Sequence, residues 1–194
     1  MKAEMIHNKN QAAAVRRIAV IGNACSGKTV VSRLLSKQLN LPVFHIDQIQ
    51  YDQNLQIRPR QATIAEITRL QNLNEWIIDG YGPLDILLTR LQAADCVVML
   101  DPPVWRNYFF AIKRIAKLVQ HKKRPELPEE SSERSFSHIR RLLRNIHQVH
   151  TKMRPEMLRI LGQPDMRGKT ILIKNLNGLK VESDIFSALH RADR

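Results

Sequence analysis

Residues 22–29 of the chain, GNACSGKT, combine two glycines, a lysine and a hydroxyl residue at the spacing of a phosphate-binding loop. Gly22 and Gly27 let the backbone curl closely around an anion, and the start of a helix adds its positive end. Lys28 supplies a charge for the β and γ phosphates, while Thr29 offers a hydroxyl to Mg²⁺. Backbone N–H groups complete the predicted ATP cradle and come from Asn23, Ala24, Cys25 and Ser26. The alternative is a glycine turn with an incidental lysine.

Three carboxylates follow short apolar runs that read as strands. Asp47 comes after VFHI, Asp79 after WII and Asp101 after VVML. In open α/β sheets the ligand lies beyond the carboxyl ends of the strands, so these residues are candidates for chemistry, although each can also cap a helix or a turn. We expect Asp79 to hold Mg²⁺ through water and Asp47 to orient or deprotonate an acceptor hydroxyl. Prolines follow Asp101 at once, which favours a turn.

Two further side chains near these motifs each leave two interpretations open. His45 lies two residues before Asp47 and is either a site residue or a core histidine with a satisfied partner. Cys25 either makes nucleotide binding sensitive to oxidation or is a small residue that the loop tolerates. Neither Cys25 nor Cys96 has a partner at metal-binding spacing, so we expect reduced thiols in a cytoplasm.

Positive charge dominates the chain. The net charge is +13 over 194 residues, and positions 113–159 alone hold thirteen basic and five acidic residues. Phosphoryl transfer needs such charge around the migrating group, and we expect Arg114 and Arg134 to supply it. Further candidates for this role are Lys122, Lys123, Arg124 and Arg154. A solvated basic surface, or one that binds nucleic acid, is the alternative.

The pattern of the rest of the chain predicts an α/β fold, because short β-branched runs alternate with segments of helical period. The predicted strands are 17–22, 43–47, 76–80, 96–100 and 170–175, and the predicted helices are 29–39, 61–72, 84–93, 104–120, 133–153 and 182–189. We expect residues 1–14 to be a disordered extension and 15–194 to be a single domain. Residues 121–134 read as a loop, either a connector or a mobile cover. The apolar positions of helix 104–119, including Tyr108, Ile112 and Ile115, are expected to pack on the sheet.

Several of these segments together resemble a known family. GNACSGKT, LPVFHID, EWIIDGYG, ADCVVMLDPP and MRPEML resemble small P-loop proteins of the adenylate-kinase-like type, and more narrowly the group known as DNA topology modulation proteins or adenylate-kinase-related kinases. The resemblance implies a three-layer fold with a five-stranded parallel sheet, ATP and Mg²⁺ binding, and a basic helical lid at about 114–155. Two positions depart from it: Leu84 and Phe110 stand near where arginines would be, and the first disfavours AMP as the acceptor.

Together these features predict a P-loop kinase that transfers the γ-phosphoryl group of ATP to a small acceptor, whether nucleoside, nucleotide or metabolite. A nucleic-acid-associated regulatory ATPase or binding protein is the alternative. No apolar run approaches the roughly 18 residues that would span a bilayer, and we expect a cytoplasmic protein.

Overall fold

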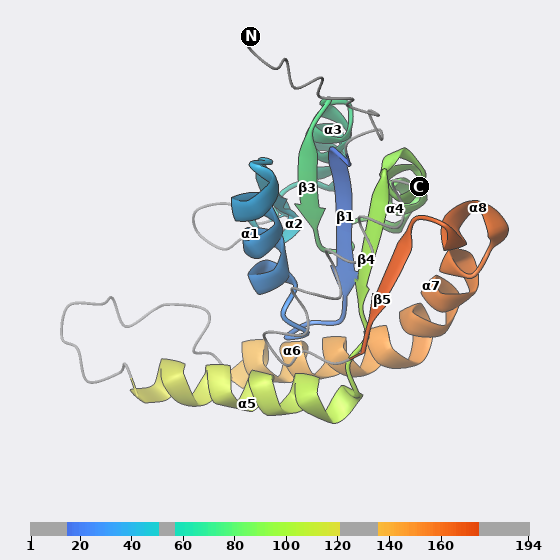
Figure 1. The fold of residues 1–194 in the computed structure, drawn as a ribbon. Coiled ribbons are helices and arrows are strands. Elements are labelled where there is room, and N and C mark those ends of the chain that lie inside the picture. The colour runs from blue at the N-terminus through green and yellow to red at the C-terminus, as the bar shows by residue number, and fades with distance from the viewer. Residues whose placement is uncertain (1–14, 51–56, 121–135, 175–194) are drawn as a thin grey trace, which may run out of the picture.

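A computed structural model describes residues 15–50, 57–120 and 136–174, in which five strands form one parallel sheet of order β2-β3-β1-β4-β5 (Figure 1). The strands are β1 (Arg17–Gly22), β2 (Val43–His45), β3 (Trp76–Asp79), β4 (Cys96–Leu100) and β5 (Thr170–Ile173). β1, β3 and β4 are almost wholly buried, as expected for strands covered on both faces. The predicted α/β class and five-stranded parallel sheet are therefore confirmed.

Helices connect these strands, because parallel neighbours require crossover connections. They are α1 (Lys28–Leu39), α2 (Ile46–Gln50), α3 (Arg60–Gln71), α4 (Leu84–Ala93), α5 (Val104–Gln120), α6 (Phe136–Gln148), the π-helix η3 (Val149–Met153), α7 (Arg154–Leu161) and α8 (Pro164–Arg167). None of the helices within the described ranges is long and apolar enough to cross a membrane.

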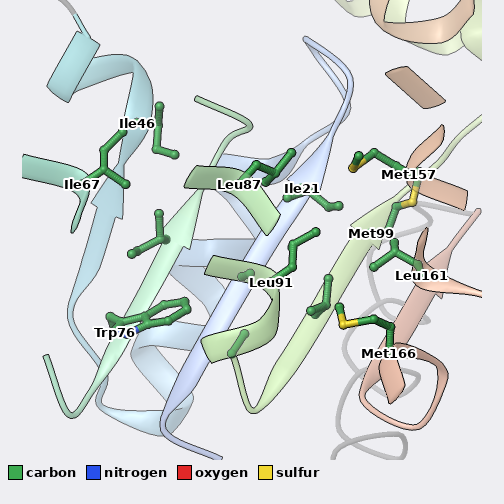
Figure 2. Close-up of a cluster of buried hydrophobic side chains, with 14 of the residues drawn as sticks. Ile21, Ile46, Ile67, Trp76, Leu87, Leu91, Met99, Met157, Leu161 and Met166 are labelled. Atoms are coloured by element: carbon green, nitrogen blue, oxygen red, sulfur yellow. The ribbon is translucent and has the colours of Figure 1, made fainter. Parts of the chain in front are cut away.

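Two apolar clusters pack on opposite faces of the sheet and make a three-layer structure. On one face, Val31 and Leu35 of α1 contact sheet residues such as Val20 and Val98. On the other face, α3, α4 and α7 bury side chains that include Ile67, Leu87 and Met157, as Figure 2 shows. Alternate residues of one strand thus face different layers.

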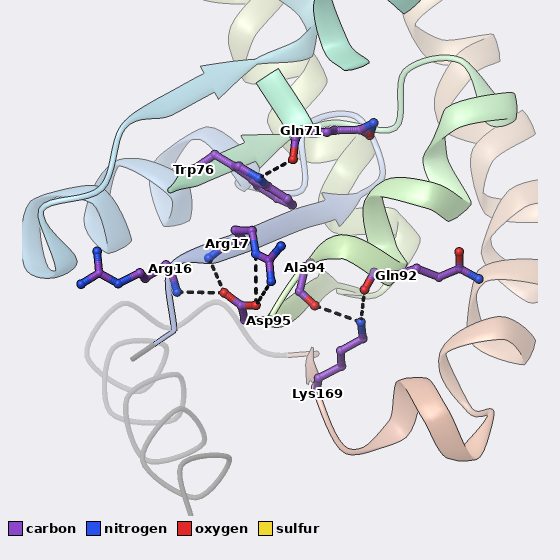
Figure 3. A network of polar contacts seen from close by, with 8 residues as sticks. All are labelled: Arg16, Arg17, Gln71, Trp76, Gln92, Ala94, Asp95 and Lys169. Atoms are coloured by element: carbon purple, nitrogen blue, oxygen red, sulfur yellow. Dashed lines mark hydrogen bonds and ion pairs between the residues drawn. The ribbon is translucent and has the colours of Figure 1, made fainter. Parts of the chain in front are cut away.

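Polar contacts join the amino ends of the strands (Figure 3). Asp95, just before β4, accepts hydrogen bonds from the backbone N–H groups of Arg16 and Arg17 and from the Arg17 guanidinium. Lys169, just before β5, donates to the carbonyl oxygens of Gln92 and Ala94. These contacts tie β1, β4 and β5 together at the end of the sheet remote from the phosphate-binding loop.

α5 and α6 run side by side across the carboxyl end of the sheet (Figure 1). The expectation that the apolar stripe of α5 packs on the sheet is wrong. Ala111 is buried and Tyr108 and Ile115 are partly buried, but Ile112 is 61% exposed and Trp105 is 63% exposed. The helix packs against α6 instead, because it runs across the carboxyl end of the sheet and not along its face (Figure 1).

Other predicted boundaries also shift. The second strand ends at His45, and residues 46–50 form a helix, because only residues 43–45 pair with β3. The described part of the predicted helix 133–153 begins at Phe136 and changes to a π-helix at Val149. The helix predicted at 182–189 and the extension at 1–14 lie outside the described residues.

Candidate functional site

The backbone of residues 22–29 has the strained geometry that its glycines allow. Gly22 has φ of +151° and Gly27, which precedes α1, has φ of +93°. A methyl group on Gly22 would lie 2.6 Å from the carbonyl oxygen of Leu100, so only glycine fits there. Cys25 also adopts a left-handed conformation, with φ of +58°. The loop therefore curls tightly between the end of β1 and the first turn of α1, as the sequence predicts.

Two asparagines anchor the loop to the helices that cross the end of the sheet. Asn23 donates from Nδ2 to the carbonyl oxygen of Ile146 in α6, at 2.9 Å, and accepts the N–H of Ala24 at 2.7 Å. Asn107 of α5, which is 1% exposed, donates to the carbonyl oxygen of Ala24 at 2.8 Å. The loop is thus joined directly to α5 and α6. Sequence reasoning missed Asn107, since an asparagine inside a helix carries no motif.

Lys28 lies at the first position of α1 and turns back over the loop. Its Nζ donates to the carbonyl oxygen of Asn23 at 2.8 Å. Burial lowers the pKa of the Lys28 ammonium, while the nearby carboxylates of Asp47 and Asp79 partly oppose this effect. The loop lysine and the carboxylates of Asp47 and Asp79 therefore share one electrostatic neighbourhood at the carboxyl edge of the sheet.

The two carboxylates occupy different environments. Asp47 does not end a strand, which corrects the prediction: it is exposed in the first turn of α2. Asp79 ends β3, as predicted, and is 4% exposed. Its Oδ2 lies 2.7 Å from Nδ1 of His45, the residue paired with it on β2. His45 is therefore hydrogen-bonded at the candidate site and is not part of the apolar core.

The oxygen groups at this edge suit a magnesium ion bound together with a nucleotide. Thr29 is exposed in the first turn of α1, and Asp79 supplies a carboxylate whose described contacts engage Oδ2 alone. No group of three metal-ligating side chains occurs within the described ranges. Mg²⁺ in phosphate-binding sites is held by one or two side chains, phosphates and water, and hard oxygen donors of this type fit it.

Only some of the predicted basic residues lie in the described part of the chain. Arg114 is exposed on α5 and is close enough to Cys25 for its charge to act on the thiol. Burial nevertheless raises the pKa of Cys25 above its ordinary value, despite the opposing charges of Arg114 and Lys28. The other predicted lid residues, Arg134 together with Lys122, Lys123 and Arg124, lie outside the described residues.

Arg154, a further candidate for the positive charge of the site, is paired with a carboxylate. It forms a bidentate ion pair with Asp101 at the end of β4, with Nε–Oδ1 at 2.6 Å and Nη2–Oδ2 at 2.8 Å. The pair lines a small pocket together with Tyr81, His150 and Asn23. Burial, with help from Asp101, raises the pKa of Tyr81 to about 12, so the phenol stays protonated at neutral pH. Asp101 is thus an ion-pair partner and not only a turn residue.

One fully buried arginine escaped sequence reasoning. Arg90 of α4 is 0% exposed and donates from Nη2 to the carbonyl oxygens of Gly80 and Tyr81, at 2.7 and 2.8 Å. Its Nε and Nη1 have no hydrogen-bond partner in the described part of the chain. Burial lowers the pKa of Arg90 to about 10, although Asp79 opposes this. Arg90 therefore holds the turn that follows β3, and no local pattern distinguishes it from a surface arginine.

Comparison with known proteins identifies the fold. No protein-family model and no curated protein matches the chain. A shikimate kinase from Aquifex aeolicus aligns with a TM-score of 0.51 and 20% identity, over 90% of this chain and 96% of that one. A shikimate kinase from Acinetobacter baumannii and a gluconokinase from Sinorhizobium meliloti align at TM-scores of 0.49, with 18% and 16% identity. They cover 89% and 91% of this chain and 94% and 92% of their own. The chain has the three-layer P-loop fold of the Aquifex shikimate kinase.

Proposed function

We propose that the protein is an ATP-dependent kinase that phosphorylates a small hydroxylated molecule. The carrying observation is that Lys28, which follows the tightly curled loop after β1, lies within electrostatic reach of Asp47 and Asp79 at the carboxyl edge of the sheet. The loop would hold the nucleotide, and the exposed Asp47 would face the second substrate. The alignment with the Aquifex shikimate kinase supports this choice of reaction class.

Each residue has a distinct role in the proposed reaction. Lys28 and the backbone of residues 22–29 bind the β and γ phosphates, while Thr29 and Asp79 would hold Mg²⁺, which neutralises phosphate charge when bound. The acceptor oxygen bonds to the γ phosphorus as the bond to the β–γ bridging oxygen breaks. ADP leaves with the bridging oxygen, and the hydroxyl proton passes to Asp47. Arg114 and Arg134 stabilise the charge on the group in transfer.

The ion pair between Arg154 and Asp101 affects which acceptor the proposed site would bind. Because Asp101 engages this arginine through both carboxylate oxygens, Arg154 offers an acceptor phosphate less charge than an unpaired guanidinium would. Together with Leu84, which is 55% exposed after β3, this supports an acceptor other than AMP. Within the proposal, the narrower relationship to DNA topology modulation proteins rests on the sequence resemblance alone.

The test is a screen of nucleosides, nucleotides and small polyols for acceptor-dependent release of ADP from Mg·ATP. Lys28→Ala is expected to lower ATP affinity at least tenfold in calorimetric titration, and Asp47→Asn to bind ATP normally but lose transfer. Lys37→Ala, which removes an exposed lysine from the other end of α1, is the control. Stimulation of ATP hydrolysis by DNA or RNA, with no small acceptor active, would instead support a nucleic-acid-associated ATPase.

A further inference from the structure

His45 and Asp79 form a close, largely buried pair between neighbouring strands. The Nδ1–Oδ2 distance is 2.7 Å, and the two side chains are 15% and 6% exposed. The residues are also backbone register partners in the parallel pairing of β2 and β3. A carboxylate oxygen is an acceptor, so the imidazole donates its Nδ1–H to Oδ2. The pairing of β2 and β3 therefore places the two side chains next to each other.

Asp79 lies next to the strand that leads into the phosphate-binding loop. Asp79 is also the register partner of Val20 on β1, two residues before the phosphate-binding loop begins. The next residue, Gly80, donates its N–H to the carbonyl oxygen of Val20 at 3.0 Å. The backbone of Asp79 is thus held on both sides, by β1 and by β2. Rotation of the side chain is the remaining freedom, and the hydrogen bond from His45 restricts it.

We infer that His45 is a positioning residue for the carboxylate that serves the nucleotide-bound Mg²⁺, an inference that rests on the proposed function. By engaging Oδ2, the imidazole leaves Oδ1 of Asp79 as the oxygen for a metal-bound water. Hydrogen bonds from outer residues to ligating groups commonly raise metal affinity by about 10–100-fold. Asp47, which is exposed on α2, serves the acceptor and has no comparable partner among the described hydrogen bonds.

The same contact explains why a polar ring is placed beside apolar strands. A buried carboxylate without a donor is unfavourable, and the Nδ1–H of His45 supplies one at the edge of the sheet. A purely structural role would predict that loss of the imidazole lowers stability and nothing else. The positioning role predicts in addition a specific loss of metal affinity, and the two are separable by experiment.

The test compares His45→Asn, His45→Gln and His45→Leu in the full-length protein. An asparagine amide can take the place of Nδ1 and keep the hydrogen bond, whereas glutamine places its amide one bond farther out and leucine removes the donor. Mn²⁺ affinity of the complex with ADP, measured by electron paramagnetic resonance, is the readout, because it needs no acceptor. Thermal melts identify variants that fail to fold, and His147→Leu, at an exposed histidine of α6, is the control.

We expect His45→Leu to weaken Mn²⁺ binding at least tenfold at unchanged ADP affinity, and His45→Asn to retain binding within about threefold. Asp79→Asn should abolish the difference between histidine and leucine at position 45. Wild-type Mn²⁺ affinity in a folded His45→Leu variant, or equal losses in Asn and Leu variants, would overturn the positioning role. If these effects occur and no small acceptor is ever phosphorylated, the positioning role stands and the proposed kinase reaction falls.

Discussion

Arg154, the first residue of α7, donates hydrogen bonds to both carboxylate oxygens of Asp101, which lies 53 positions earlier at the end of β4. The Asp101 side chain is only 7% exposed, whereas Arg154 is 35% exposed. The hydrogen bonds to Asp101 raise the pKa of Arg154 above its ordinary value. The pair fastens the segment after the π-helix to the carboxyl edge of the sheet.

Arg154→Ala is therefore expected to destabilise the protein, because it leaves the buried Asp101 carboxylate without its partner. We expect a loss of about 2–3 kcal/mol in the free energy of unfolding, below the value for a fully buried pair because Arg154 is partly solvated. Arg159→Ala, which breaks an exposed i,i+3 pair with Glu156 in the same helix, should leave the free energy of unfolding almost unchanged, because water screens that pair. Urea denaturation measures both, and equal effects would contradict a special role for the Asp101 pair.

Gly22→Ala should damage the phosphate-binding loop itself. The φ of +151° disfavours any side chain. The added methyl would also lie 2.6 Å from the backbone carbonyl oxygen of Leu100, which can move only if the strand itself shifts. We expect a loss of more than about 1 kcal/mol in stability and a large fall in ATP affinity, measured by melting and calorimetry. Gly168→Ala, where a methyl meets nothing within 4 Å, is the matched control. A Gly22→Ala protein with wild-type ATP affinity would contradict the loop assignment.

The Asp95 contacts predict how stability depends on acid. Burial alone would raise the pKa of Asp95, but the hydrogen bonds from Arg17 and from the backbone N–H of Arg16 and Arg17 bring it below the ordinary value. Because the folded-state pKa is the lower one, this contribution is complete above the unfolded pKa of about 3.9 and is lost as pH falls through the folded value. Asp95→Asn should therefore destabilise by about 1–2 kcal/mol at pH 7.

The difference between wild type and Asp95→Asn should shrink as the pH falls below about 4, because the Asp95 carboxyl is then protonated in the unfolded chain before it is protonated in the folded protein. Urea unfolding between pH 3 and pH 7 checks this. A difference that stays constant over the whole range would show that the amide disturbs packing and that the charge of Asp95 is not what stabilises the strand ends.

Cys25 should react slowly with alkylating agents in spite of its place in the loop. Burial raises its thiol pKa, so little thiolate exists at pH 7.5. We expect labelling by iodoacetamide to be slower than for a free thiol, to accelerate as pH rises and to be suppressed by Mg·ATP. Cys25→Ser identifies the labelled site, since burial raises the pKa of Cys96 to about 12 and keeps that thiol inert. Fast labelling at pH 7.5 would favour a redox-sensitive loop.

Local patterns in the sequence were sufficient for the strands β1, β3 and β4 and for the phosphate-binding loop. The glycines and Lys28 act through backbone geometry that a few consecutive residues determine, and buried runs of β-branched residues have few alternatives in an α/β chain. The extent of β2 was predicted wrongly at Asp47, because the strand ends where its pairing with β3 ends and not where the apolar run does.

Only the tertiary structure decided which polar side chains meet. His45 finds Asp79 through strand register, Asp101 finds Arg154 across 53 residues, and Arg90 is buried under the turn after β3. Each of these contacts depends on which strands become neighbours and on where a helix crosses the sheet. The sequence by itself therefore predicted the loop of residues 22–29 and its position between a strand and a helix. The packing of distant segments decided which charges remain available around it, because pairing and burial alter the charge that each residue presents.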